Sequence, residues 1–133
     1  MIEQLIHHPT LPLAFSFEDD GRVAWGYLHR DGGVVADVWL YNRAETPLKP
    51  EWPNRNATPY RNTAKYSKTL LEFELPVTED EISVEWIENA DGVPGARILL
   101  NSQMIGELFV GDMPGRSLMA ALDGPCARTL VVS

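Results

Sequence analysis

The chain has 133 residues and a formal net charge of −8, and 44% of its residues are hydrophobic. This length corresponds to one ordinary domain, so we expect a single domain over residues 1–133 that folds without disulfides or a metal. The acidic charge argues against nonspecific binding to nucleic acid or to an anionic membrane, because both need a basic surface.

Cysteine usage and the N-terminal stretch predict a cytoplasmic protein. Cys126 is the only cysteine, so it cannot form an internal disulfide, and we interpret it as a structural residue. Residues 1–15 carry an acid, no basic region and two prolines, which is unlike a signal peptide. Apolar runs elsewhere fall far short of the ~20 residues that a membrane helix needs.

A first antiparallel meander is predicted over residues 13–43. Apolar and polar residues alternate with the strand period of two, and turn residues separate the segments 13–18, 22–30 and 34–43. Asp20-Gly21 and Asp31-Gly32 suit tight hairpin turns, because Asp and Gly tolerate positive φ angles.

A second meander is predicted over residues 69–111. The same alternation indicates strands at 69–76, 82–88, 96–100 and 104–110. Asp91-Gly92 and residues 101–103 mark turns between them. In 69–76 the apolar residues alternate with Glu72 and Glu74, which predicts a strand with one wet face.

The C-terminal part is predicted to form a short helix over 116–124 and a last strand over 128–132. Ser117 can cap the helix and Gly124 can end it, with Leu118, Met119 and Leu122 facing the core. Together these elements predict a mainly β fold, an antiparallel β-sandwich or partly open barrel of about eight strands with one short C-terminal helix. The alternative is an α+β fold with a single twisted antiparallel sheet.

A basic, proline-rich insert, residues 44–68, joins the two meanders. Counted from 43 to 68, it has six bases against two acids, a net +4. The rest of the chain has five bases against 17 acids, a net −12, which accounts for the total of −8. Long loops of this kind are often functional. Arginine and aromatic side chains form interface hot spots, so the candidate binding residues are Trp52, Arg55, Tyr60, Arg61 and Tyr66. The alternative is that the insert packs back on the acidic body.

No pattern of residues indicates catalysis or a bound metal or cofactor. His7 and His8 are adjacent and point to opposite sides of an extended chain, and His29 stands alone on a predicted strand. The acidic run 79–81 is interpreted as a solvated turn. We therefore expect no catalytic residue, no metal and no cofactor.

Two hypotheses about function follow. The first is a small, acidic, cytoplasmic, non-enzymatic protein-interaction module, with a protein partner or a second copy as a homodimer. The partner would contact the insert or the opposing acidic face, and the net charge favours a basic partner. By analogy of size and charge alone, it is an inhibitor or immunity type like those of bacteria. The competing hypothesis is a small-ligand-binding β-domain or enzyme. Its pocket would be lidded by 44–68 and lined by aromatic side chains, namely Trp25, Tyr27, His29, Trp39 and Tyr41.

Overall fold

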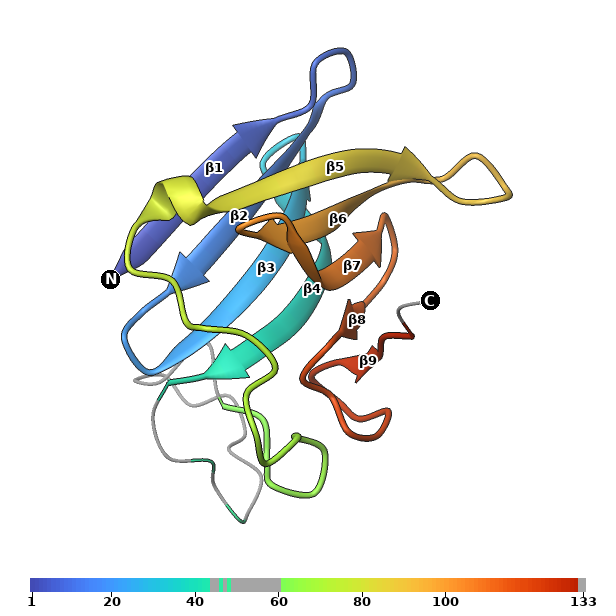
Figure 1. Ribbon diagram of the computed structural model, residues 1–133. Helices are drawn as coiled ribbons and strands as arrows, with labels where there is room; N and C mark the ends of the chain where they lie inside the picture. The colour runs from blue at the N-terminus through green and yellow to red at the C-terminus, as the bar shows by residue number, and fades with distance from the viewer. Residues whose placement is uncertain (44–45, 47, 49–60, 132–133) are drawn as a thin grey trace.

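The computed structural model describes residues 1–43, 46, 48 and 61–131, and its regular elements are nine β-strands and one short 3-10 helix (Figure 1). The first sheet has the order β1-β2-β3-β4, formed by Ile2–His7, Leu13–Asp19, Val23–Arg30 and Gly33–Asn42. The second has the order β5-β6-β7-β8-β9, formed by Ile82–Glu88, Pro94–Leu100, Gln103–Phe109, Arg116–Ser117 and Arg128–Thr129. The 3-10 helix η1, Glu79–Glu81, precedes β5. The prediction of a mainly β, sandwich-like fold with antiparallel sheets is confirmed, although β9 pairs with β8 in parallel.

The hairpin turns have the backbone geometry that their residues predicted. Asp31 and Gly32 between β3 and β4 have φ angles of 51° and 80°. Asn101 and Ser102 between β6 and β7 have φ angles of 48° and 71°. Two consecutive positive φ angles match the right-handed twist of the flanking strands, so these turns fix the hairpin registers.

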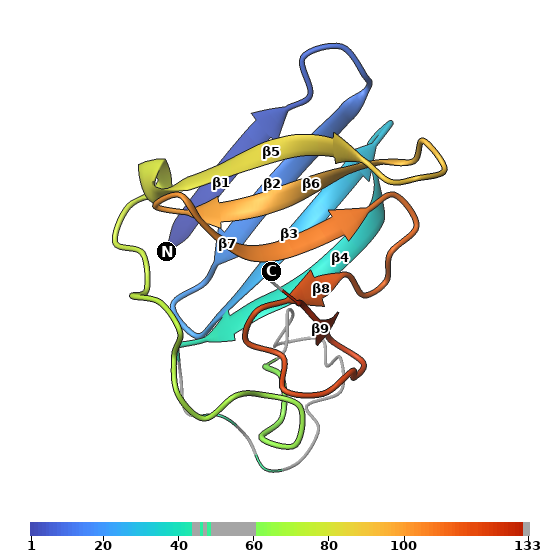
Figure 2. The same ribbon diagram turned by 45° about the vertical axis from the view of Figure 1, so that its right-hand side comes forward.

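The core lies between the two sheets, which Figure 2 shows as stacked layers with β5, β6 and β7 in front of the first sheet. Phe15, Phe17 and Leu28 of the first sheet are fully buried, as are Ile98 and Leu108 of the second. Along β2 these inward positions alternate with more exposed ones, whereas β3 is buried at Val23, Ala24, Trp25 and Gly26 in succession. The hydrophobic contacts between the layers therefore hold the two sheets in a fixed relation.

The free edge of β4 is covered by the C-terminal part of the chain. The backbone N–H of Asp37 donates to the carbonyl of Asp112 (3.0 Å), and that of Gly115 donates to the carbonyl of Asp37 (2.7 Å). The backbone N–H of Trp39 donates to the carbonyl of Cys126 (2.9 Å), and the Cys126 side chain is buried. These bonds satisfy an edge that would otherwise be open.

The predicted helix over 116–124 is wrong. Ser117 lies in β8, and the N–H of Leu118 donates to the carbonyl of Ile105 (2.9 Å). The N–H of Lys68 donates to the carbonyl of Met119, again at 2.9 Å. Because neighbouring segments supply these backbone partners, tertiary pairing replaces the helical bonds that local propensity favours.

The predicted strand over 69–76 is also wrong, although its alternation of burial is right. Phe73 and Leu75 pack against the core, whereas Glu72 and Glu74 are exposed. This segment leads from the first sheet to the second, and none of the strands in the described residues pairs with it. Its carbonyls accept side-chain hydrogen bonds instead, such as the one from Gln103 Nε2 to Glu72 (3.2 Å).

Two further differences concern the ends of the chain. The structure has an N-terminal strand, β1, that the sequence analysis did not predict, paired with β2 from Ile2 opposite Asp19 to His7 opposite Ala14. Leu5 is 56% exposed, so the apolar residues of β1 do not all share one face and the alternation is obscured. At the other end, β9 covers only Arg128–Thr129 of the predicted 128–132. No helix in the described residues is long and apolar enough to cross a membrane.

Candidate interaction edge

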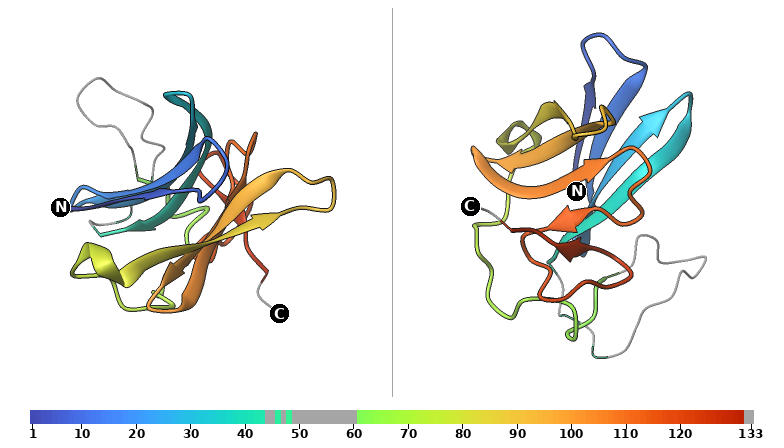
Figure 3. Two further views of the ribbon diagram at one scale, coloured as in Figure 1. Left: turned by 90° about the horizontal axis from the view of Figure 1, so that it is seen from above. Right: turned by 90° about the vertical axis from the view of Figure 1, so that its right-hand side faces the viewer.

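Residues 69–96 form the most acidic part of the chain. They contain eight acids and no lysine or arginine, namely Glu72, Glu74, Glu79, Asp80, Glu81, Glu85, Glu88 and Asp91. Figure 1 shows this stretch rising to η1 on the left and then crossing the front of the molecule as β5. Seen from above, the β5–β6 hairpin projects from the body on the side away from the N-terminus (Figure 3). We call this stretch the acidic edge.

Glu81 fixes the corner where the acidic edge enters β5. Its Oε2 accepts hydrogen bonds from the backbone N–H groups of Val77 (2.6 Å) and Thr78 (2.9 Å), and its Oε1 accepts one from Asn101 Nδ2 (2.9 Å). These hydrogen bonds, that from Asn101 first, lower the pKa of Glu81 to about 2. Gln4 Nε2 also donates to the carbonyl of Glu79 (3.1 Å), which ties η1 to β1.

β5 is the outermost strand of its sheet (Figure 2). At one end of β5 the backbone N–H of Asn101 donates to the carbonyl of Glu81 (2.9 Å). At the other end the backbone N–H of Asn89 donates to the carbonyl of Val93 (3.0 Å). The β5–β6 register between these bonds is regular. Hydrogen-bonded pairs alternate in an antiparallel ladder, so the odd-numbered residues of β5 bond to β6 and the backbone groups of Val84, Trp86 and Glu88 point outward.

A cleft of about 370 Å³ opens beside the end of β5, and we call it the edge cleft. It is lined by His8, Thr10 and Leu11 of the β1–β2 turn and by Trp86, Ile87, Glu88 and Pro94. The rings of His8 and Trp86 lie 4.9 Å apart. His8 Nδ1 accepts backbone hydrogen bonds from Thr10 (3.1 Å) and Leu11 (3.0 Å), so this nitrogen carries no proton in this geometry.

The chemistry of the edge cleft suits a long cationic side chain. Trp86 and Ile87 are half-buried and supply apolar wall, while Glu88 is exposed at the rim. Lysine and arginine place an apolar stem along such a wall and a charged head in water or against a carboxylate. An indole face adds cation–π attraction.

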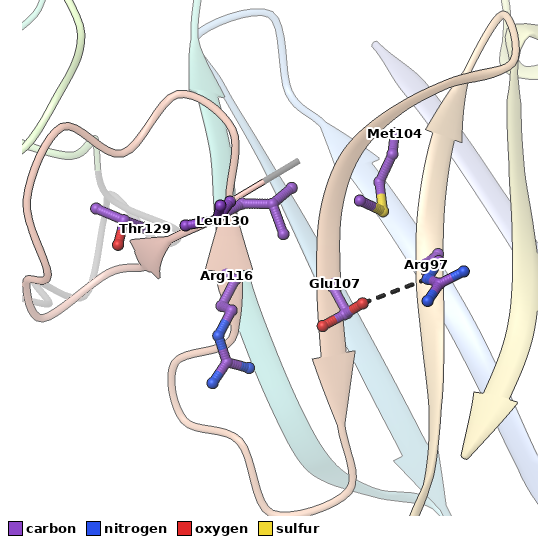
Figure 4. Close-up of a pocket in the computed structure, with 7 residues that line it drawn as sticks. Arg97, Met104, Glu107, Arg116, Thr129 and Leu130 are labelled. Atoms are coloured by element: carbon purple, nitrogen blue, oxygen red, sulfur yellow. Dashed lines mark hydrogen bonds and ion pairs between the residues drawn. The ribbon is translucent and has the colours of Figure 1, made fainter. Parts of the chain in front are cut away.

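A second pocket, of about 400 Å³, lies on the outer face of the second sheet (Figure 4). It is lined by Arg97, Met104, Glu107, Arg116, Thr129, Leu130 and Val131. Arg97 is paired with Glu107 (3.4 Å) and with Glu85 (3.7 Å). Glu107 lies opposite Arg116 in the β7–β8 register. Because this carboxylate sits between the two arginines, the pocket is a weaker anion site than its arginines alone would suggest.

The residues predicted for binding in the insert are only partly described. Trp52, Arg55 and Tyr60 lie outside the described residues. Arg61 and Tyr66 are half-buried. The ring of Tyr66 packs against Gly124, where an added Cβ would lie 2.6 Å from the ring, and its carbonyl accepts the N–H of Ala121 (2.7 Å).

The residues of the alternative aromatic pocket do not all share one face. Trp25, Tyr27 and His29 follow one another along β3, with ring centroids 6.2 Å apart at each step. Trp39 lies opposite Trp25 in the β3–β4 register. Tyr41 points to the other face of the sheet, where it packs with Phe17 and donates a hydrogen bond to Asp19. Trp39 lines a small pocket of about 140 Å³ together with Ser67 and Met119.

His29 donates to or accepts from Ser16, with 2.7 Å between Nε2 and Oγ. Within the described part of the chain, no group of three or more His, Cys, Asp or Glu side chains is placed to hold a metal ion. No protein-family model, curated protein or solved structure matched this chain.

The sequence predicted an acidic face opposite the insert as the alternative contact surface for a partner, but did not assign it to residues 69–96. Residues 79–81 were interpreted as a solvated turn, and the acids of 72–74 as the wet face of a strand. The signal was available as a stretch of 28 residues, 69–96, with eight acids and no base. The edge cleft could not be found in this way, because His8 and Trp86 are far apart in sequence.

Proposed function

We propose that this protein is a non-enzymatic, cytoplasmic protein-interaction module whose acidic edge binds a basic partner. The observation that carries the proposal is the absence of any lysine or arginine among residues 69–96, which hold eight acids. Two of these acids are paired with bases from outside the stretch, Glu72 with Lys68 (2.8 Å) and Glu85 with Arg97 (3.7 Å). A surface of one sign raises the rate of association with a partner of opposite sign and disfavours other partners.

Binding of a basic protein fits an inhibitor or immunity-type role, in which a toxin is neutralised when its surface is covered. Exposed acids on an edge strand also discourage nonspecific pairing between copies. The two roles are compatible, because charges that repel a second copy attract a basic chain.

A charge-matched pair of variants tests this proposal. The edge variant carries Glu74→Gln, Glu79→Gln and Glu88→Gln, and the control variant carries Glu3→Gln, Glu18→Gln and Asp31→Asn. All six side chains are exposed, and each variant loses the same negative charge. Binding of a synthetic lysine-rich polypeptide is measured by calorimetry at low and at high salt.

We expect the edge variant to bind about tenfold more weakly, since three exposed ion pairs at about 0.5 kcal/mol each amount to roughly that factor. The control variant should stay close to wild type, and high salt should remove the difference. An equal loss in both variants would mean that only the net charge matters, which contradicts the proposal.

Co-purification from the protein's native cells extends the test to the physiological partner. We expect a basic protein that is retained by wild type and by the control variant and lost by the edge variant. A partner retained equally by all three would place the contact surface elsewhere.

A further inference from the structure

The outer edge of β5 offers backbone groups that no described residue uses. The N–H and C=O groups of Val84, Trp86 and Glu88 point away from β6, as the bonds at residues 81 and 89 require. No backbone hydrogen bond joins these three residues to any described segment beyond β6. Unpaired groups on a regular strand are a template for a further strand.

We propose that an extended basic segment of the partner adds to β5 as a further strand and places a lysine or arginine side chain in the edge cleft. This inference rests on the proposed function and goes beyond it by giving the binding mode. Main-chain hydrogen bonds would supply affinity, and side chains on the two faces of the added strand would supply specificity.

The added strand would continue the two faces of β5, with alternate side chains on each face. Trp86 and Glu88 lie on the face that borders the edge cleft, and Glu85 lies on the opposite, solvent face. A partner residue beside Trp86 therefore points into the cleft, where its stem contacts the indole and Pro94 and its cation reaches Glu88. On the other face Glu85 already has Arg97 as a partner (3.7 Å), so the cation in the edge cleft carries the charge recognition.

The edge cleft is held in shape before any partner binds. The two backbone hydrogen bonds to His8 Nδ1 fix the β1–β2 turn, and the His8 ring contacts Trp86 at 4.9 Å between centroids. Preorganisation of this kind lowers the ordering cost of binding.

Charge decides which chain occupies the edge. A second copy would bring the same acidic edge, with Glu85 and Glu88 on its own β5. Like charges on adjoining strands are unfavourable, whereas opposite charges stabilise the pair. A basic segment of a different protein is therefore the occupant that we infer, and a homodimer through β5 is the outcome that would contradict it.

The test uses an N-acetylated, C-amidated peptide of lysine, arginine and valine with the length of β5, seven residues. A second peptide has the same sequence with N-methyl groups on two adjacent central residues. Because adjacent backbone N–H groups of an extended peptide point to opposite edges, each edge loses one hydrogen-bond donor while the charge of the peptide is kept. We expect the methylated peptide to bind the full chain at least about tenfold more weakly.

Amide hydrogen exchange gives the direct readout. In the free protein, the amides of Val84 and Trp86 should exchange quickly, and those of Ser83 and Glu85 should be protected by β6. The unmodified peptide should protect Val84 and Trp86 and leave the other two unchanged. Unprotected Val84 and Trp86 amides at saturating peptide would overturn strand addition.

A pair of charge-reversal variants tests the cleft. Glu88→Lys should weaken peptide binding more than about tenfold, while Asp91→Lys, three residues away in the exposed turn, should weaken it less than about threefold. Equal effects would contradict the placement of a cation in the cleft.

The outcomes separate this inference from the proposed function. If the methylated peptide binds as well as the unmodified one, yet both still discriminate the edge variant from the control variant, strand addition is wrong and the acidic edge remains a binding surface. If neither peptide discriminates the edge variant from the control variant, the proposed function fails. A dimer by sedimentation that is lost in the edge variant would make a second copy the occupant.

Discussion

Arg43 and Asp19 form an ion pair, with 2.6 Å between Nε and Oδ2, and the carboxylate side chain is 1% exposed. Asp19 also accepts hydrogen bonds from the hydroxyl of Tyr41 (2.5 Å) and from the N–H of Gly21 (2.9 Å). Arg43 donates in addition to the carbonyl of Pro76 (2.5 Å). The pair thus joins the end of the first sheet to the segment that carries the acidic edge.

Loss of either donor should destabilise the protein. Arg43→Met leaves a buried carboxylate without its counter-charge and should cost about 3–5 kcal/mol in the free energy of unfolding. Tyr41→Phe removes one hydrogen bond to a charged group and should cost about 1.5–3 kcal/mol. Burial, and then the bond to Asp19, raise the pKa of Tyr41, so its hydroxyl stays a donor at neutral pH. Urea unfolding measures both costs.

Arg30→Met is the matched control for the arginine change. Arg30 is exposed at the end of β3, so its replacement should change the free energy of unfolding by less than about 0.5 kcal/mol. An Arg43→Met variant as stable as Arg30→Met would show that the ion pair contributes nothing.

The half-buried carboxylate of Asp37 should lower the stability of the folded protein when it ionises. Burial raises the pKa of Asp37 above its ordinary value of 3.8, so the folded state holds the proton more tightly than the unfolded state. Stability should therefore fall as pH rises through the folded-state pKa. Asp37→Asn should raise Tm at neutral pH, and the gain should vanish below about pH 3.8. A gain that is the same at both pH values would mean that ionisation of Asp37 is not its cause.

Gly115 should not tolerate a side chain. A Cβ there would lie 2.6 Å from the carbonyl oxygen of Glu107 and 2.7 Å from Leu108 Cβ. Gly115→Ala should therefore cost about 1–3 kcal/mol, because backbone must shift. Gly33→Ala, where the nearest atom lies at 3.7 Å, is the control and should be close to neutral. Thermal unfolding of the two variants checks the difference, and equal Tm values would contradict the close approach.

Much of the fold could be predicted because its turns are encoded locally. Asp31-Gly32 and Asn101-Ser102 define hairpins through residues that accept positive φ, and the strands beside them alternate clearly. The segment 116–124 failed because its backbone partners, such as Ile105, come from distant parts of the chain. The segment 69–76 failed because alternation reports burial of side chains and says nothing about a neighbouring strand.

The candidate site was less accessible to sequence reasoning than the fold. The charge of the acidic edge can be counted from the sequence, but the open backbone of β5 depends on which strands end each sheet. The edge cleft depends on His8 and Trp86, which are brought together only by the stacking of the two sheets. Local sequence patterns predict neither the open backbone edge of β5 nor the contact between His8 and Trp86.

Glu3 and Glu18 stand opposite each other in the β1–β2 register, and both are exposed. Like charges on directly opposed residues of antiparallel strands are unfavourable. Glu3→Lys should therefore raise the free energy of unfolding by about 0.2–1 kcal/mol, and Glu3→Gln should give a smaller gain. The gain from the lysine should shrink at high salt. A loss of stability on Glu3→Lys would argue against the register.

The central claim is that the acidic edge is the contact surface for a basic partner. The most direct measurement is a map of amide chemical shifts in the full chain as the lysine, arginine and valine peptide is added. We expect the largest shifts on β5, at Val84, Trp86 and Glu88, and on the turn at Thr10 and Leu11. Largest shifts around Arg97 and Arg116, or at residues 61–68, with β5 unchanged, would contradict it.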